Sequence, residues 1–276
     1  MSRHAAPPRV QDRIRSAHLP AAVLAATVGA LAAALPSLGE AGPLLVVGAL
    51  QALLIWAWVV GTATPGRIGS ILLPAGVGGS ADALLVIRTG DGVTPLLAVL
   101  GLLFPVLLAH QLSRGVVRVR LTESLSGVAT ECVAVGALAC YLELAQTSRP
   151  IASAALLAAA AGLFGGHLVD LAWPAQAFAE GVFHGLAGVV GSVVLGTLAA
   201  VLRLAGEPVP LAGAVLLGAA MGVSVGLVAV GASYVAQTAQ PRRAAFAAVT
   251  LPVLRVLLPI AVTAALAYVL GLVVAR

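Results

Sequence analysis

The chain alternates long apolar runs with short segments that carry arginine, proline or glycine. A run of about 20 apolar residues is long enough to cross a bilayer as an α-helix. Nine runs meet this length: residues 19–38, 43–63, 68–87, 92–112, 121–145, 150–172, 181–203, 209–234 and 244–275. The pattern predicts an all-α fold, a polytopic transmembrane helix bundle of about nine spans. The connections are too short for a soluble domain, so residues 19–276 are expected to form a single transmembrane domain.

Two of these runs are unusual. Residues 68–87 contain Gly76, Gly78 and Asp82, which make this the weakest span, and a re-entrant segment is the alternative. Residues 244–275 are long for one straight helix and contain Pro252 and Pro259, so we expect a kink or a start in the membrane interface. The first run is longer than the apolar core of a signal peptide, and we expect it to remain as a span.

Composition supports a membrane protein and excludes several classes. Hydrophobic residues make up 61% of the chain and charged residues 9%, with a mean hydropathy of +1.08. A soluble domain carries about 25% charged residues. Soluble enzymes, secreted disulfide scaffolds and nucleic-acid binders are therefore excluded, the last also because no strip of basic and aromatic residues is present. The many Ala, Val and Leu residues, with Arg and no Lys, suggest a GC-rich bacterial genome and hence the cell inner membrane.

The arginines predict the orientation of the chain. Cytoplasmic segments of membrane proteins carry an excess of positive residues. With nine crossings and residues 1–18 as a cytoplasmic N-terminal tail, ten arginines fall on the cytoplasmic side and four on the other. We therefore expect the N-terminus inside and the C-terminus outside.

Ionisable residues inside the predicted spans are candidate functional groups, because burying a charge in a bilayer is costly. Glu131 and Arg255 each lie about halfway along a span, at the same expected depth. We expect them to form an intramembrane charge pair, which serves either a proton, ion or anion site or the joining of two helices. Asp82 and Glu143 are candidate members of a relay.

A second group of polar residues lies around residues 167–184. His167 and Asp170 are three residues apart, and Glu180 and His184 are four apart, so each pair lies on one helix face. Two histidines and two carboxylates are suitable ligands for a divalent metal such as Zn, Mn or Fe. The alternative is a solvated polar cluster at the membrane surface.

Small residues at regular spacing predict close helix packing. Gly218, Gly222 and Gly226 repeat every fourth residue, which allows two helix backbones to approach each other. Two common catalytic signatures are lacking: the chain contains no phosphate-binding GxxxxGK and no HExxH motif.

Three stretches of the chain have a residue pattern similar to that of a known family. They are HQLSRGVVRVRLTESLSGVATECVAVGALACYLELA, then GLFGGHLVDLAWP followed by FHGLAG, and finally LLPIAVTAALAYVL after Leu254 and Arg255. From about residue 96 onward the sequence resembles the phosphatidate cytidylyltransferase family, the integral membrane enzymes that make CDP-diacylglycerol. The resemblance implies a helical membrane protein of lipid metabolism whose chemistry would lie in loops 173–180 and 235–243. The predicted topology places both loops on the cytoplasmic side.

The chain departs from this family at the residues that the resemblance marks as catalytic. Ala232, Leu254 and Leu257 stand at its acidic positions, His184 stands at its signature Glu, and its Lys positions are unfilled. Arg255 and Gly185 match. Nucleotidyl transfer needs carboxylates to hold Mg²⁺ on a triphosphate. The resemblance therefore implies a non-catalytic relative.

Three functions follow from this sequence. The first is a non-catalytic protein that binds a membrane lipid, a second copy of itself or another membrane protein. The second is a proton- or ion-coupled small transporter that uses Glu131, Asp82 and Arg255. The third is an active but divergent cytidylyltransferase, in which His167, Asp170, Glu180 and His184 would have to supply the metal.

Overall fold

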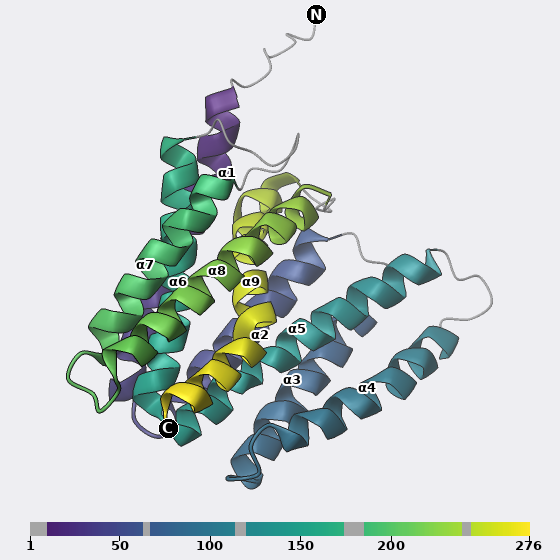
Figure 1. The fold of residues 1–276 in the computed structure, drawn as a ribbon. Helices are drawn as coiled ribbons and strands as arrows, with labels where there is room; N and C mark the ends of the chain where they lie inside the picture. Colours follow the sequence, from purple (N-terminus) through teal and green to yellow (C-terminus); the bar gives the residue numbers. More distant parts are fainter. Residues whose placement is uncertain (1–9, 63–66, 114–119, 174–184, 239–243) are drawn as a thin grey trace, which may run out of the picture.

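A computed structural model describes residues 10–62, 67–113, 120–173, 185–238 and 244–276 (Figure 1). In these ranges the chain is helical. The elements are α1 Val10–Ala34, the short 3-10 helix η1 Leu35–Ser37, α2 Gly42–Gly61, α3 Gly69–Ile87, α4 Thr94–Ser113, α5 Leu121–Thr147, α6 Arg149–Ala172, α7 Leu186–Leu204, α8 Leu211–Thr238 and α9 Ala244–Val274. Nine helices of this described part are long and apolar enough to cross a membrane. The chain is a multi-span helical membrane protein.

Each predicted span corresponds to one helix. The weakest of them, residues 68–87, is the continuous helix α3, which carries Pro74 in its interior. Residues 244–274 form the single helix α9, which includes both Pro252 and Pro259. The glycine and proline content of these two segments argues against a helix. Both are helical nevertheless, because their side chains pack against neighbouring helices of the bundle.

Part of the segment predicted as a tail, residues 1–18, belongs to the first helix. Helix α1 begins at Val10, and Ala17 and His18 are buried, with 6% and 3% of their surface exposed. The cause is tertiary: the backbone oxygen of Ala17 and the ring of His18 both contact other helices, as described below. Residues 1–9 lie outside the described part of the chain.

Helix α7 has two distinct faces. Small residues at every fourth position are buried, namely Gly188, Ser192, Gly196 and Ala200. The opposite face exposes large side chains at the same spacing, namely Leu186, Val190, Val194, Leu198 and Leu202. The small face packs against α6 and α8, and the large face is left for lipid. Side-chain size alone therefore orients α7 in the bundle.

The glycines of α8 allow close contact with α7, as their spacing predicts. A Cβ added at Gly222 would lie 2.5 Å from the carbonyl oxygen of Ser192, and one added at Gly218 would lie 2.6 Å from the Cα of Thr197. Gly226 faces Val189 and Ser192 in the same way. Each neighbour is fixed at least partly by the backbone of α7, so larger residues at these positions would push the helices apart.

Helix α4 stands apart from the rest of the bundle, beside α3 and α5 (Figure 1). Its side chains Leu97, Leu102, Phe104 and Leu112 are between 64% and 69% exposed. Leu103 and Leu107 anchor the helix against Val77, Val128 and Cys132. So much exposed hydrocarbon requires lipid as its surroundings.

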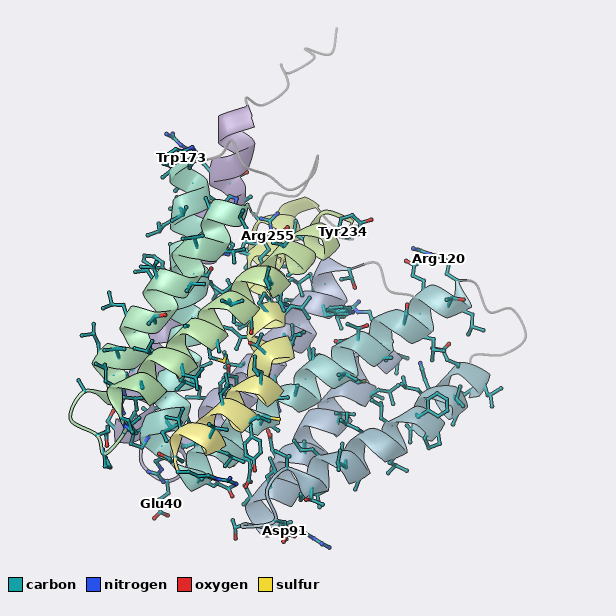
Figure 2. All side chains as sticks on the ribbon, in the orientation of Figure 1. Glu40, Asp91, Arg120, Trp173, Tyr234 and Arg255 are labelled. Carbon is teal, nitrogen blue, oxygen red and sulfur yellow. The ribbon has the colours of Figure 1, made fainter. Side chains whose placement is uncertain are left out.

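The labelled side chains mark the two ends of the bundle. Arg120, Trp173 and Tyr234 lie at one end, here called the Arg120 end, and Glu40 and Asp91 lie at the other, here called the Asp91 end (Figure 2). Helix α1 begins at the Arg120 end and α9 ends at the Asp91 end (Figure 1). The start of the first helix and the end of the last helix therefore lie at opposite ends of the bundle.

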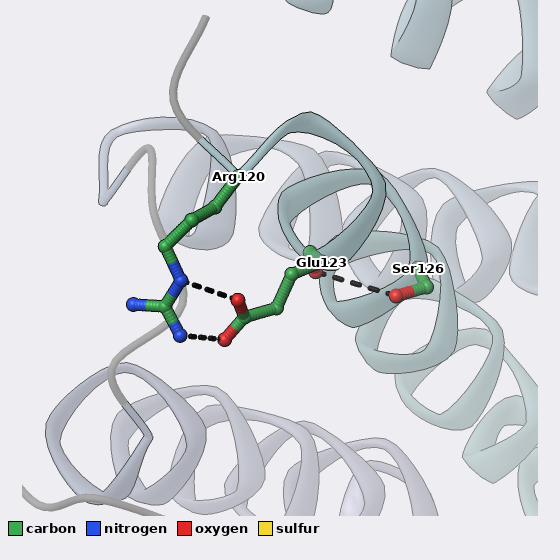
Figure 3. Close-up of polar contacts among 3 residues, drawn as sticks. All are labelled: Arg120, Glu123 and Ser126. Carbon is green, nitrogen blue, oxygen red and sulfur yellow. Dashed lines mark hydrogen bonds and ion pairs between the residues drawn. The ribbon is translucent and has the colours of Figure 1, made fainter.

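An ion pair marks the first turn of α5. The guanidinium of Arg120 donates through Nε and Nη2 to the two carboxylate oxygens of Glu123, and the Ser126 hydroxyl donates to the backbone oxygen of Glu123 at 3.3 Å (Figure 3). A carboxylate at a helix N-terminus also interacts favourably with the helix dipole. Both side chains are about half exposed, so this pair belongs to the surface of the Arg120 end.

Candidate functional site

Glu131 lies in the middle of α5 with none of its surface exposed. It belongs to the buried face of α5 that also carries Ser124, Val128 and Val135. Neither carboxyl oxygen has a hydrogen-bond partner among the described residues. The sequence located this residue correctly inside a span, but its surroundings could be read only from the packed helices.

Arg255 lies in α9 and is 8% exposed. Its Nη1 donates a hydrogen bond of 3.0 Å to the backbone oxygen of Ala17 in α1. The ion pairs of the described residues do not include one between Arg255 and Glu131, and the oxygens of Glu131 accept no bond from it. The structure therefore does not bring the expected charge pair together. Equal depth is a matter of sequence position, whereas the direction in which each side chain points is set by packing.

Asp82 takes part in a buried connection among three helices. Its Oδ1 accepts a hydrogen bond of 3.2 Å from Nε2 of Gln51 in α2, and the same amide nitrogen lies 3.3 Å from the backbone oxygen of Val135 in α5. Gly78 leaves room for this amide, since a Cβ there would lie 3.0 Å from Gln51 Oε1. Gln51 was not among the predicted residues. The signal was available, because Gln51 is the lone amide in an otherwise apolar span.

Glu143 lies further along α5, toward the Asp91 end, and is 3% exposed. Twelve residues separate it from Glu131, which corresponds to about 18 Å along a helix. No direct hydrogen bond can join two side chains over this distance, so the structure does not place Glu143 and Glu131 in one contact.

His167 and Asp170 are both buried near the end of α6. Nδ1 of His167 lies 3.0 Å from Nδ1 of His18, and the two rings meet edge to face. Asp170 Oδ1 accepts a hydrogen bond of 3.1 Å from the backbone nitrogen of Gly185, where α7 begins. A Cβ at Gly188 would collide with the Asp170 carboxylate, so glycine is needed there.

Of the predicted metal cluster, the structure describes His167 and Asp170. Glu180 and His184 lie outside the described residues. Within the described part of the chain, no three His, Cys, Asp or Glu side chains are grouped so that they could hold a metal ion. The contacts of Asp170 instead suit a carboxylate at a helix N-terminus, where it compensates the dipole of α7. His18, the partner of His167, was missed because the sequence placed it in the tail.

A groove of about 530 Å³ runs between α3, α4, α5 and α9. It is lined by Val77, Ala81, Leu96, Val99, Leu100, Ala129, Thr130, Val133, Ala134, Gly136, Ala137, Cys140, Val262 and Ala265. None of these side chains is charged. Along α5 the lining runs from Ala129 to Cys140, about 16 Å of helix. The groove is therefore an elongated apolar space within the membrane-spanning part of the molecule.

A second groove of about 530 Å³ lies between α3 and α4. It is lined by Leu72, Leu73, Gly76, Val77, Ser80, Ala83, Leu84, Ala98, Val99, Leu102, Leu103 and Val106. Val77 and Val99 line both grooves, so the two spaces adjoin at these residues. The weak attachment of α4 is what leaves both spaces open.

Comparison of the chain with protein-family models, with curated proteins and with solved structures finds no match.

Proposed function

We propose that this protein binds a membrane lipid and holds one acyl chain in the groove between α3, α4, α5 and α9. The observation that carries the proposal is the lining of that groove, which is apolar apart from the Thr130 hydroxyl and the Cys140 thiol. A polar solute would lose its hydration there without gaining hydrogen bonds. A hydrocarbon chain loses no hydrogen bonds on entering the groove, and hydrocarbon is also the solvent that surrounds these helices.

The proposal includes ancestry from phosphatidate cytidylyltransferases without their catalysis. Leu254 and Leu257, which stand at two acidic positions of that family, are fully buried in the apolar core, and Ala232 is 3% exposed. Replacing carboxylates by buried hydrocarbon removes the ligands that a Mg²⁺–triphosphate needs. Burial at these positions supports a bundle that kept a lipid-sized space and lost nucleotide chemistry. The composition, rich in Ala, Val and Leu with Arg and no Lys, supports a place in the bacterial inner membrane.

The test fills the groove. Ala137 of α5 is half-buried and lines it, so Ala137→Phe places a ring in the space that an acyl chain would occupy. Ala220 of α8 is also half-buried but lines neither groove, and Ala220→Phe is the matched control. We expect native mass spectrometry of protein extracted from vesicles to find lipid on the wild type and on Ala220→Phe, and less than half as much on Ala137→Phe.

Two results would contradict the proposal. Equal lipid on both variants would mean that the bound lipid lies elsewhere. Formation of CDP-lipid from CTP by the purified wild-type protein, above the level of a boiled sample, would show that the protein is catalytic. That result would contradict the loss of catalysis but would not bear on whether the groove holds a lipid.

A further inference from the structure

Glu131 carries a carboxyl group in surroundings that do not compensate a negative charge. Its side chain is fully buried, and among the described residues neither oxygen accepts a hydrogen bond or meets a cation. An isolated carboxylate in a low-dielectric interior is very costly, whereas a carboxylic acid is a neutral polar group. We propose that Glu131 is a proton-binding site, occupied by its proton in the conformation described here.

The helices that pack against α5 offer no substitute for that proton. Helix α2 has no titratable side chain. The titratable and charged residues of the other neighbours are Asp82 on α3, His110 on α4, Arg149, His167 and Asp170 on α6, and Arg255 and Tyr268 on α9. Helix α5 itself adds Glu123, Cys132, Cys140, Tyr141 and Glu143.

Four members of this set make contacts with groups other than Glu131. Arg255 donates to the backbone of α1, and His167 meets the ring of His18. Glu123 is paired with Arg120 at the helix end. Asp82, the carboxyl on the helix most extensively packed against α5, is held by the amide of Gln51. A proton is therefore the simplest positive charge that Glu131 can take up.

Hydrogen-bonded polar groups lie on both sides of Glu131 along α5. Toward the Arg120 end, the buried Ser124 hydroxyl accepts a bond of 3.2 Å from the Gln111 amide. Seven residues separate Ser124 from Glu131, about 10 Å. Toward the Asp91 end, the bond between Gln51 and Asp82 is made beside the Val135 oxygen, one helical turn from Glu131. Glu131 thus lies between two hydrogen-bonded polar groups inside an apolar bundle and makes no hydrogen bond to either of them.

A metal cation fits this place less well than a proton. Mg²⁺ and Ca²⁺ need about six or more oxygen ligands at short distance. The described residues contain no group of three His, Cys, Asp or Glu side chains suited to a metal. A single carboxyl group binds one proton without further ligands.

Infrared spectroscopy of the full-length protein in lipid vesicles tests the proposal, because a carboxylic acid and a carboxylate absorb at separate frequencies. At neutral pH we expect the wild type to show a carboxylic-acid C=O band that Glu131→Gln lacks. Glu123→Gln is the control, since the exposed Glu123 is ion-paired, and the acid band should be unchanged in that variant. Raising the pH should convert the wild-type band into a carboxylate band.

A second measurement keeps the test decisive if Glu131→Gln fails to fold. Glutamate labelled with ¹³C in the side-chain carboxyl shifts an acid band that comes from glutamate, and Glu143→Gln removes the other described glutamate that is nearly fully buried. The labelled Glu143→Gln protein should still show the shifted acid band. An ionised Glu131 at neutral pH in both measurements would overturn the proposal, and so would loss of the acid band on adding Na⁺ alone at constant pH.

Discussion

At the scale of single residues, glycine positions decide how closely two helices approach. Gly222 faces the backbone of Ser192 and Val193, which cannot move without moving α7. Gly231 lies on the same helix α8, and a Cβ there would meet nothing within 4 Å. The two positions differ only in what stands opposite them.

This difference makes a matched pair of variants. We expect Gly222→Ala to lower the free energy of unfolding by about 1–3 kcal/mol, because the added methyl group must push α7 and α8 apart. Gly231→Ala should leave stability unchanged or raise it slightly, since alanine is the better helix former. Thermal unfolding in the same detergent measures both, and equal midpoints for the two variants would contradict the packing described for α7 and α8.

Residue-level prediction succeeded for position along a span and failed for partners. Glu131, Asp82 and Arg255 were correctly placed inside spans because long apolar runs define depth. The expected partner of Arg255 was Glu131, yet its guanidinium donates to Ala17, a backbone atom in a segment predicted to be a tail. Sequence gives no measure of which way a side chain points around a helix whose whole surface is apolar.

At the scale of helices, one amide joins α2, α3 and α5. Gln51 donates to the Asp82 carboxylate and lies within hydrogen-bond distance of the Val135 oxygen, and both Gln51 and Asp82 are less than 8% exposed. Removing one partner of a buried polar pair leaves the other unsatisfied. Removing both leaves an apolar contact.

A double-mutant cycle measures this connection. We expect Gln51→Leu to cost about 1–3 kcal/mol, because the Asp82 carboxyl loses its donor. The double variant Gln51→Leu with Asp82→Ala should be more stable than the sum of the two single losses predicts. Strict additivity in chemical or thermal unfolding would show that the pair does not interact.

The bounds of the helices were predictable to within a few residues for most spans, because length and hydrophobicity determine a transmembrane helix. Helix α1 is the exception. Its first turns carry Asp12, Arg13 and Arg15, so hydropathy placed them in water, although the structure continues the helix back to Val10. Ala17 and His18, which follow this polar beginning, contact α9 and α6.

At the scale of the whole molecule, nine spans require the two ends of the chain to lie on opposite sides of the membrane. The connection that contains Glu40 and the end of α9 lie at the same end of the bundle (Figures 1 and 2). We expect reporter fusions at the N-terminus to be active in the cytoplasm, and fusions after Glu40 and at the C-terminus to be active outside it. The arginine distribution predicts this orientation.

The fusion after Glu40 serves as an internal control, because it depends on one span alone. If the fusions after Glu40 and at the C-terminus report different compartments, the number of crossings between them is odd, and one of the helices α2 to α9 does not span the membrane. If both report the cytoplasm, the spans stand and the chain is inverted.

The sequence by itself determined three things: that this chain is a membrane protein, which residues form its spans, and at what depth its ionisable residues lie. Those properties depend on how many apolar residues follow one another, which the chain order contains directly. Only the tertiary structure decided that Arg255 turns to α1, that Glu131 has no hydrogen-bond partner among the described residues and that α4 stands apart beside two grooves. Inside lipid every helix face is apolar, so the choice of neighbours rests on side-chain shape, and shape complementarity exists only once the helices have met.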